Sequence, residues 1–287
     1  MVASYSDRID RIVRFLNEQV QSSHSLRDLA SVAEISPYHF HRVYRAVTGE
    51  TPSGTLRRLR IARAVAMLRD STKTITEIAF DVGYETSQAF SKAFRQRTGH
   101  SATEARKDRS KLDALIEQLS GAPKRRKQSE LEVRLVSVEP FKVIASRHIG
   151  RPEGLFAAFG ALFEWGEKSG LLNDYRGIYG IPVDDPRDEE QARFDCCFDF
   201  GPKAVPDKEY RKETLGGGLY TVTRLTGPYD GLEDKYDEFY GSWLASSNYV
   251  LRDSRAYNHY VIDPGTVPPE QWQTDIYLPV ASLPLNS

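Results

Sequence analysis

The sequence predicts a two-domain protein: an all-α N-terminal module of two helix-turn-helix units, followed by an α+β domain of two strand-helix-strand-strand repeats. Apolar residues recur at helical spacing through residue 108, and one helical unit recurs after about 50 residues. Strand-type segments after residue 131 repeat at an offset of 77. A length of 287 residues suits two domains of roughly 100–200 residues. We expect domains at 1–108 and 131–287, joined by a linker at 109–130.

Composition excludes two broad classes of protein. The mean hydropathy is −0.50, and no apolar run approaches the ~18 residues that span a bilayer, so we expect no membrane segment and no membrane partner. The only cysteines, Cys196 and Cys197, are adjacent and would point to opposite faces of a strand. They cannot form a disulfide framework, which indicates a cytoplasmic protein.

The charge is distributed unevenly along the chain. Residues 1–110 carry six more basic than acidic side chains, whereas residues 131–287 carry nine more acidic than basic ones. A basic first part suits a polyanionic partner such as nucleic acid. Two solvated surfaces of unequal charge are an equally valid interpretation of the charges alone.

The N-terminal helices are predicted from apolar faces and end signals. Residues 9–16 and 26–33 each place apolar side chains at helical spacing. Ser36 is a predicted N-cap before Pro37, and Thr48–Gly49 ends that helix.

A second copy of this unit follows at an offset of 49 to 50 residues, with Ser36, Phe40, Tyr44 and Gly49 matching Thr86, Phe90, Phe94 and Gly99. Each copy is a helix, a tight turn and a second helix, which is the helix-turn-helix layout. The segment 53–71 between the copies is predicted as a core-facing helix about 25 Å long. Such a strut could hold two recognition helices in successive major grooves.

The linker is predicted from its polar composition. After a short helical tail it contains Gly121–Pro123 and the basic run Lys124–Lys127. We favour a solvated linker over a phosphate-binding role for this run.

These features resemble the AraC/XylS family of transcription regulators over about residues 5–108. The most specific stretch is 78–84 (IAFDVGY), followed by 90–95 (FSKAFR) and Thr98–Gly99. One departure is Ala102, where the family usually has a proline that the first copy keeps as Pro52.

The resemblance implies a double-stranded DNA partner and base-reading side chains on both recognition helices, with RNA polymerase as a further partner. Carried over position by position, the DNA-binding residues are Tyr38, His41, Arg42, Arg45, Ser87, Gln88, Ser91, Lys92 and Arg95. Arginine can bond guanine and glutamine can bond adenine, whereas Arg45 and Arg95 suit phosphates.

The second half is predicted from strand-type segments and two amphipathic helices. Strands are expected at 132–138, 142–149, 176–183, 192–200 and 219–225, with helices at 153–169 and near 230–245. Arg147 and Gly150 match Arg224 and Gly227 at the offset of 77. The segments 194–200 and 274–280 are then equivalent strands.

This half resembles the GyrI-like effector-binding domain over about residues 131–284, on the stretches 217–220, 227–232, 243–244 and 272–280. Similar domains bind bulky, often cationic aromatic compounds in an aromatic cavity with an acidic group. Fused to an AraC-like module, the arrangement resembles a Rob-type regulator.

The resemblance and the aromatic content together give a set of candidate effector-binding residues. The candidate acid is Asp275, and the candidate walls are Trp165, Tyr179, Phe198, Tyr220, Tyr240, Trp243, Tyr257 and Tyr277. At these spacings half or more of the aromatic residues are expected to be ordinary core. Asn258 replaces an acid that the family often carries, which leaves room for a neutral ligand, and the neighbouring His259 is interpreted as a strand-surface residue.

The interpretation of the chain as an enzyme has weaker support. The triple glycine 216–218 lacks the Lys-Ser/Thr of a phosphate loop, and no HExxH, CxxC or Gly-x-Ser-x-Gly motif occurs. We expect no catalytic residue, metal site or cofactor. Hydrolysis of a reactive small molecule is the alternative, as in some GyrI-like domains, and an enzyme-inhibiting protein module is a third. The favoured interpretation is a one-component regulator, more usually an activator in the resembling family, that binds a promoter and an organic effector.

Overall fold

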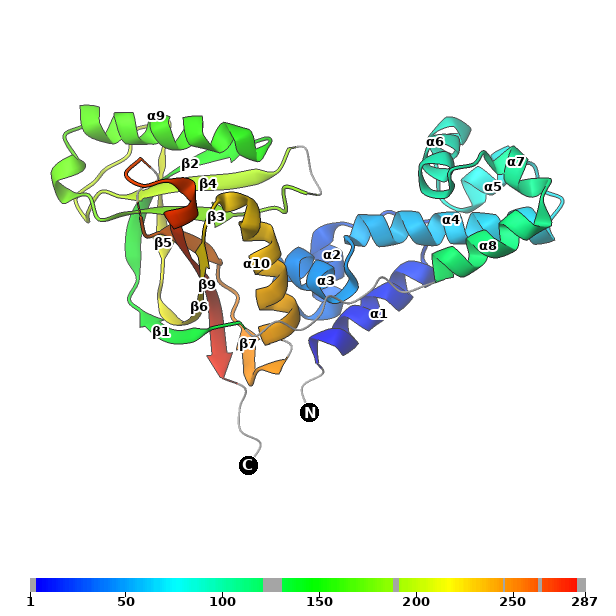
Figure 1. Ribbon diagram of the computed structural model, residues 1–287, viewed down its shortest axis with the longest axis horizontal. Coiled ribbons are helices and arrows are strands. Elements are labelled where there is room, and N and C mark those ends of the chain that lie inside the picture. The colour runs from blue at the N-terminus through cyan, green and yellow to red at the C-terminus, as the bar shows by residue number, and fades with distance from the viewer. Residues whose placement is uncertain (1–3, 121–130, 188–190, 245, 263–264, 283–287) are drawn as a thin grey trace. The chain divides into compact units, whose positions relative to one another are not determined.

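The computed structural model describes residues 4–120, 131–187, 191–244, 246–262 and 265–282 (Figure 1). Contacts divide the chain into two compact units. The first unit comprises Met1–Glu34 and Tyr44–Arg126, and the second comprises Ile35–Val43 and Lys127–Ser287. The predicted basic run Lys124–Lys127 lies within residues 121–130, which are outside the described residues.

The N-terminal half is helical, as predicted. Its helices are α1 (Tyr5–Glu18), α2 (Leu26–Ala33), α3 (Phe40–Thr48), α4 (Pro52–Asp70), α5 (Ile75–Asp81), α6 (Ser87–Thr98), α7 (Ala102–Arg106) and α8 (Arg109–Ser120). Helices α1, α2, α5 and α7 begin with capping boxes, in which a Ser or Thr and an acid three residues later satisfy free N–H groups. Helix α4 begins with Pro52 at its first position, capped by Thr51.

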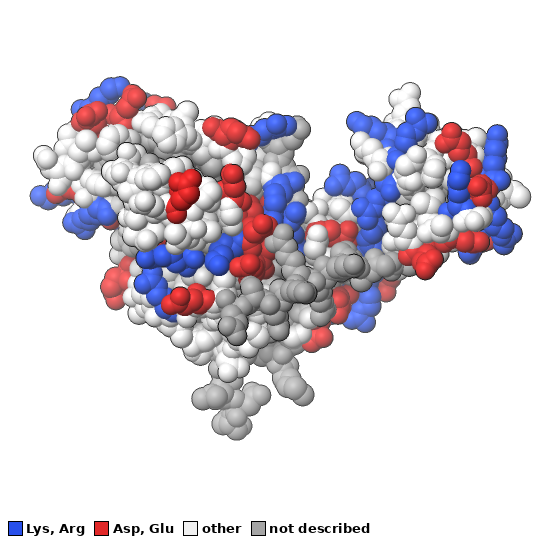
Figure 2. All heavy atoms as spheres, viewed as in Figure 1, with Lys and Arg blue, Asp and Glu red and all other residues white. Residues whose placement is uncertain are grey.

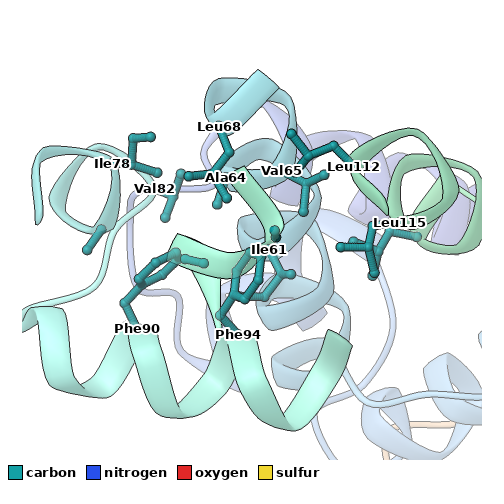
Figure 3. Close-up of a cluster of buried hydrophobic side chains, with 14 residues drawn as sticks. Ile61, Ala64, Val65, Leu68, Ile78, Val82, Phe90, Phe94, Leu112 and Leu115 are labelled. Atoms are coloured by element: carbon teal, nitrogen blue, oxygen red, sulfur yellow. The ribbon is translucent and has the colours of Figure 1, made fainter. Parts of the chain in front are cut away.

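The first unit has a core built on α4. Ile61, Ala64, Val65 and Leu68 of α4 pack with Ile78 of α5 and with Phe90 and Phe94 of α6 (Figure 3). Leu112 and Leu115 of α8 belong to the same cluster. The helical tail predicted at the start of the linker is therefore packed into this core.

The turn between α5 and α6 depends on a glycine. Gly83 has φ of +93°, and an added Cβ would lie 2.8 Å from the backbone of Gln21. Only glycine accommodates both the left-handed backbone and the close approach. This turn sets where α6 starts.

The second unit is built on one antiparallel sheet whose strands differ in length. Its strands are β1 (Arg134–Val138), β2 (Phe141–Ile149), β3 (Gly177–Pro182), β4 (Arg193–Asp199), β5 (Arg211–Leu215), β6 (Gly218–Thr226), β7 (Tyr249–Leu251), β8 (Tyr257–Tyr260) and β9 (Gln273–Ser282). Their order is β1-β6-β9-β8-β3-β4-β2-β5, and β7 pairs with β9. Its helices are α9 (Leu155–Lys168), α10 (Leu232–Glu238) and the π-helical segment Phe239–Leu244, with short 3₁₀ turns at Pro152–Gly154, Leu172–Asp174, Tyr229–Gly231 and Pro269–Gln271.

The predicted duplication is confirmed by the element order. One repeat is β2-α9-β3-β4 and the other is β6-α10-β8-β9, and their last strands β4 and β9 are the equivalent pair. Strands β5 and β7 were not predicted. Strand β5 has the sequence RKETL, whose charged residues hide the strand pattern, and β7 is only three residues long.

Both repeat helices cover the same face of the sheet. Tyr236 of α10 donates a hydrogen bond to Asn258 of β8, and Phe159 of α9 packs on Phe198 of β4. Asn258 is in register with Gly180, which pairs with Cys196, so these side chains and Phe198 share one face. We call this the helix face.

The opposite face carries Phe141, Tyr179, Tyr220, Tyr257 and Tyr277, and we call it the tyrosine face. These rings form one apolar cluster with Val143, Ala145, Ile181, Cys197 and Leu215.

Candidate functional site

Helix α6 presents the candidate DNA-binding residues of the second copy on one side. Its N-cap Thr86 accepts from the backbone of Ala89, and Phe90 and Phe94 face the core. Because residues three and four positions apart share one side of a helix, Gln88, Ser91, Lys92 and Arg95 are exposed and Ser87 is half-buried.

The exposed side of α6 adjoins the start of α7. A hollow is lined by Ser91, Lys92 and Arg95 of α6 together with Ser101 and Thr103. Figure 2 shows Lys and Arg side chains over this part of the first unit. Hydroxyl and basic groups in this arrangement can form hydrogen bonds with the phosphates of DNA and with the base edges beside them.

The first copy differs, because residues 35–43 belong to the second unit. Arg42 is 2% exposed, and its Nη1 lies 2.7 Å from Oε2 of Glu233. Its guanidinium carbon is 4.0 Å from the centre of the Tyr236 ring. Burial favours the neutral form of Arg42, but the charge of Glu233 outweighs this and raises the pKa of Arg42. Arg42 was expected to point to solvent, and Glu233, the acid that holds it, is 191 residues away in the sequence.

The neighbouring histidines are buried and neutral. His39 is 0% exposed, and its Nδ1 is hydrogen-bonded to the Tyr240 hydroxyl at 2.8 Å. Burial lowers the pKa of His39 to about 4 and that of His41 to about 3. Tyr38 remains exposed beside Arg255, and Arg45 is half-buried.

Four of the aromatic residues predicted to form the effector-binding wall meet on the tyrosine face. Tyr257 stacks on Tyr277 with ring centres 4.6 Å apart, and it contacts Tyr220 at 5.4 Å and Tyr179 at 6.1 Å. Phe141, which was not predicted, packs on Tyr179 at 5.1 Å. Burial raises the pKa of Tyr179 to about 12, so its hydroxyl stays protonated.

Two other predicted residues lie on the helix face. Phe198 packs under Phe159 and Phe163 of α9. Trp165 of α9 contacts Tyr210 at 5.0 Å, and its indole nitrogen donates to Asp207 at 2.8 Å. The sheet separates both residues from the tyrosine face, because neighbouring strand positions alternate between faces.

Tyr240 and Trp243 form a third group in the π-helical segment after α10. Trp243 stacks on Tyr249 of β7, while Tyr240 contacts His39. The predicted wall is thus divided among three places, and the tyrosine face holds the largest group.

Asp275 lies on the tyrosine face beside Tyr277, with its carboxylate occupied. Arg134 donates to it at 2.5 Å, and Arg224 donates through Nε at 2.6 Å and Nη2 at 2.9 Å. Its side chain is 4% exposed, and the hydrogen bond to Asp275 raises the pKa of Arg224.

Asp195 is the equivalent acid of the other repeat, and sequence reasoning missed it. Arg147 pairs with Asp195 in the β2–β4 register as Arg224 pairs with Asp275 in the β6–β9 register. Arg147, Arg211 and Arg255 all form ion pairs with Asp195, which is 0% exposed. The signal was present in the sequence, because 194–200 and 274–280 align Asp195 with Asp275 and the 77-residue offset aligns the arginines.

Asn258 and His259 occupy opposite faces of β8. Asn258 is 1% exposed and accepts from the Tyr236 hydroxyl at 2.7 Å, so it joins α10 to the sheet on the helix face. His259 stacks on Tyr179 at 4.7 Å on the tyrosine face. Burial lowers the pKa of His259, which favours the neutral ring.

The described residues offer neither a metal-binding cluster nor a membrane-spanning helix. Among them no group of three His, Cys, Asp or Glu residues is placed to hold a metal ion. Within the same parts of the chain, no helix has the length and apolar character needed to cross a membrane.

Comparison with known proteins gives a match in each half. A model described as the GyrI-like small molecule binding domain matches residues 131–281, more than half of the chain. A helix-turn-helix domain model matches residues 29–108.

Three curated proteins are similar to parts of the chain. Probable transcriptional regulator YgiV of Escherichia coli O157:H7 is 27% identical over 53% of this chain and 97% of that protein. HTH-type transcriptional activator RhaS of Escherichia fergusonii is 33% identical over 36% of this chain and 37% of its own length. Regulatory protein SoxS of Salmonella typhimurium is 28% identical over 32% of this chain and 87% of that protein.

Proposed function

The chain belongs to the GyrI-like small-molecule binding family and carries an AraC-type helix-turn-helix domain. We propose that it is a transcription activator controlled by an aromatic effector. The N-terminal helices bind a promoter in the cytoplasm, and the effector bound to the second unit alters that binding or the contact with RNA polymerase. Control of this kind requires that the effector bind the free and the transcription-competent states with different affinity.

The exposed side of α6 is the observation that supports DNA binding most directly. Gln88, Ser91, Lys92 and Arg95 are available to solvent on a helix whose other side is fixed in the core. A rigid helix with such side chains can enter a major groove and bond base edges. In the first copy, Arg42 can read a base only when its ion pair with Glu233 is released.

The test is selection of DNA from a random duplex library with the full-length protein. We expect enrichment of a sequence with two segments about one helical turn apart. Lys92→Gln should weaken binding to the enriched sequence about tenfold. Lys111→Gln, an equal charge change at an exposed position of α8, should leave it nearly unchanged. Failure to enrich any sequence would refute the proposed DNA-binding function.

We also propose that the effector is bound without being turned over. A catalytic carboxylate must be free to take a proton from water. Asp195 and Asp275 instead accept hydrogen bonds from arginines, and Asn258, at the family's acidic position, faces α10. Recovery of the bound compound with its mass unchanged would support this role, and a changed mass would refute it.

A further inference from the structure

The tyrosine face is flanked by two clusters of arginine and carboxylate side chains. On one side, Arg134 and Arg224 surround Asp275. On the other side, Arg147, Arg211 and Arg255 surround Asp195, and Glu213 pairs with Arg211 and Arg255. These clusters bring five guanidinium groups and three carboxylates to the edges of the aromatic rings. Their formal charge is therefore positive.

The two kinds of group differ in their exposure. The carboxylates of Asp195 and Asp275 are 0% and 4% exposed. The arginines around them are 31% to 57% exposed, with Arg134 the most exposed. A molecule that approaches the rings from solvent therefore meets guanidinium groups, beneath which the carboxylates are already neutralised.

A further guanidinium lies against the same rings. Arg252 is 5.2 Å from the centre of the Tyr220 ring. It donates to the carbonyl oxygens of Gly217, Leu219 and Val280. Carbonyl oxygens hold the side chain in place without cancelling its charge, so Arg252 adds to the positive potential at this end of the face.

We propose that the tyrosine face binds an aromatic anion, such as a planar aromatic carboxylate, rather than an aromatic cation. This assignment rests on the proposed effector-binding function and names the chemical class of the effector. Tyr179 and Tyr277 are half-buried and offer ring surface for stacking. Each guanidinium has five N–H donors, so Arg134 and Arg224 retain donors for a ligand carboxylate while they hold Asp275. A ligand cation would be repelled by the same groups.

The first experiment compares matched ligands on the full-length protein by calorimetric titration. The probes are 2-naphthoate, 2-naphthylmethanol and 2-naphthylmethyl-trimethylammonium, which share one ring system and differ in charge. We expect 2-naphthoate to bind about tenfold more tightly than the alcohol, and the cation to bind most weakly. Tightest binding of the cation would overturn the assignment but leave effector binding standing. Absence of binding by all three probes would refute effector binding at this face itself.

Variants separate the roles of the arginines and the acid. Arg134→Gln should weaken 2-naphthoate binding about tenfold, because it removes an exposed donor. Lys212→Gln is the control, since Lys212 lies on β5 next to Arg211 and points to the helix face. An equal loss in both variants would show general charge attraction and overturn the proposal.

Asp275→Asn gives the opposite expectations for the two ligand classes. If the face binds anions, removing this carboxylate releases Arg134 and Arg224 and leaves 2-naphthoate affinity equal or higher. If Asp275 anchors a cation, the same change abolishes binding of the ammonium probe. Thermal unfolding of each variant verifies that the fold is retained.

Discussion

At residue scale, His39 and His41 make the stability of the second unit depend on pH. His39 and His41 are buried and neutral, with pKa values lowered by burial to about 4 and about 3. In the unfolded chain a histidine takes up its proton near pH 6.5. The unfolded state therefore binds more protons as the pH falls below about 6.5, and stability is lost over that range.

We predict that the free energy of unfolding of the second unit falls by about 2 kcal/mol for each of these histidines between pH 7 and pH 5. Urea unfolding of the full-length protein at both pH values measures this. His39→Gln should remove about half of the pH dependence. Equal pH dependence in the wild type and in His39→Gln would contradict the buried, neutral state of His39.

The residue scale also shows where sequence reasoning was limited. The helical spacing that places Lys92 outward in α6 also places Arg42 outward in α3, and only Lys92 is exposed. Glu233 and Tyr236, which cover Arg42, are remote in sequence, and periodicity carries no information about such contacts. Asp195, by contrast, could have been found by applying the observed repeat to its acid as well as to its arginines.

At the scale of elements, the turn before α6 depends on Gly83. Alanine there would strain the backbone at φ of +93° and place its Cβ 2.8 Å from Gln21. Gly83→Ala should therefore lower the free energy of unfolding by about 2–3 kcal/mol.

Gly99 provides the matched control for that change. It caps α6 with φ of +75°, and nothing lies within 4 Å of an added Cβ. Gly99→Ala should cost only about 1 kcal/mol, from the backbone alone. Thermal or urea unfolding measures both variants, and equal losses would show that the close approach at Gly83 has no energetic effect.

The start of α7 offers a stabilising change. Ala102 occupies the first helical position after the N-cap Ser101, whose ψ of 152° is compatible with a following proline. Although the family proline is missing, the capping box from Ser101 to Glu104 keeps this helix start intact. We predict that Ala102→Pro raises the free energy of unfolding by about 0.5–1 kcal/mol, measured by urea unfolding. A loss of stability would show that the buried site cannot hold the ring.

Element prediction succeeded where the pattern was long or duplicated. The helical spacing of α1, α2, α5 and α6, and the repeated strand-helix-strand-strand order, were visible in the sequence. The start predicted after Ser36 was wrong, because a turn precedes α3, which begins at Phe40. The division of the aromatic residues between the two faces was less accessible. Trp165 and Phe198 were expected with Tyr257, but Trp165 belongs to α9 and Phe198 lies beneath α9, both on the helix face.

At the scale of the whole molecule, the chain combines a DNA-binding module with a small-molecule binding domain. Under the proposed control, any change that the effector makes in DNA affinity is matched by an equal change that DNA makes in effector affinity, because the two affinities are thermodynamically linked. The two-domain class was predictable, since the character of the sequence changes near residue 131. The charge proposed for the effector was not predictable, because it depends on which side chains surround Asp195 and Asp275.

The most direct test of effector control is to measure the DNA affinity of the full-length protein with and without a saturating effector. Fluorescence anisotropy with the enriched duplex measures this, using the tightest-binding naphthyl probe and Tyr277→Leu as the variant with a weakened tyrosine face. We predict that the probe changes the DNA dissociation constant at least about fivefold, and that Tyr277→Leu abolishes this change at the same probe concentration. A probe that binds the tyrosine face while DNA affinity stays the same in both proteins would contradict the account.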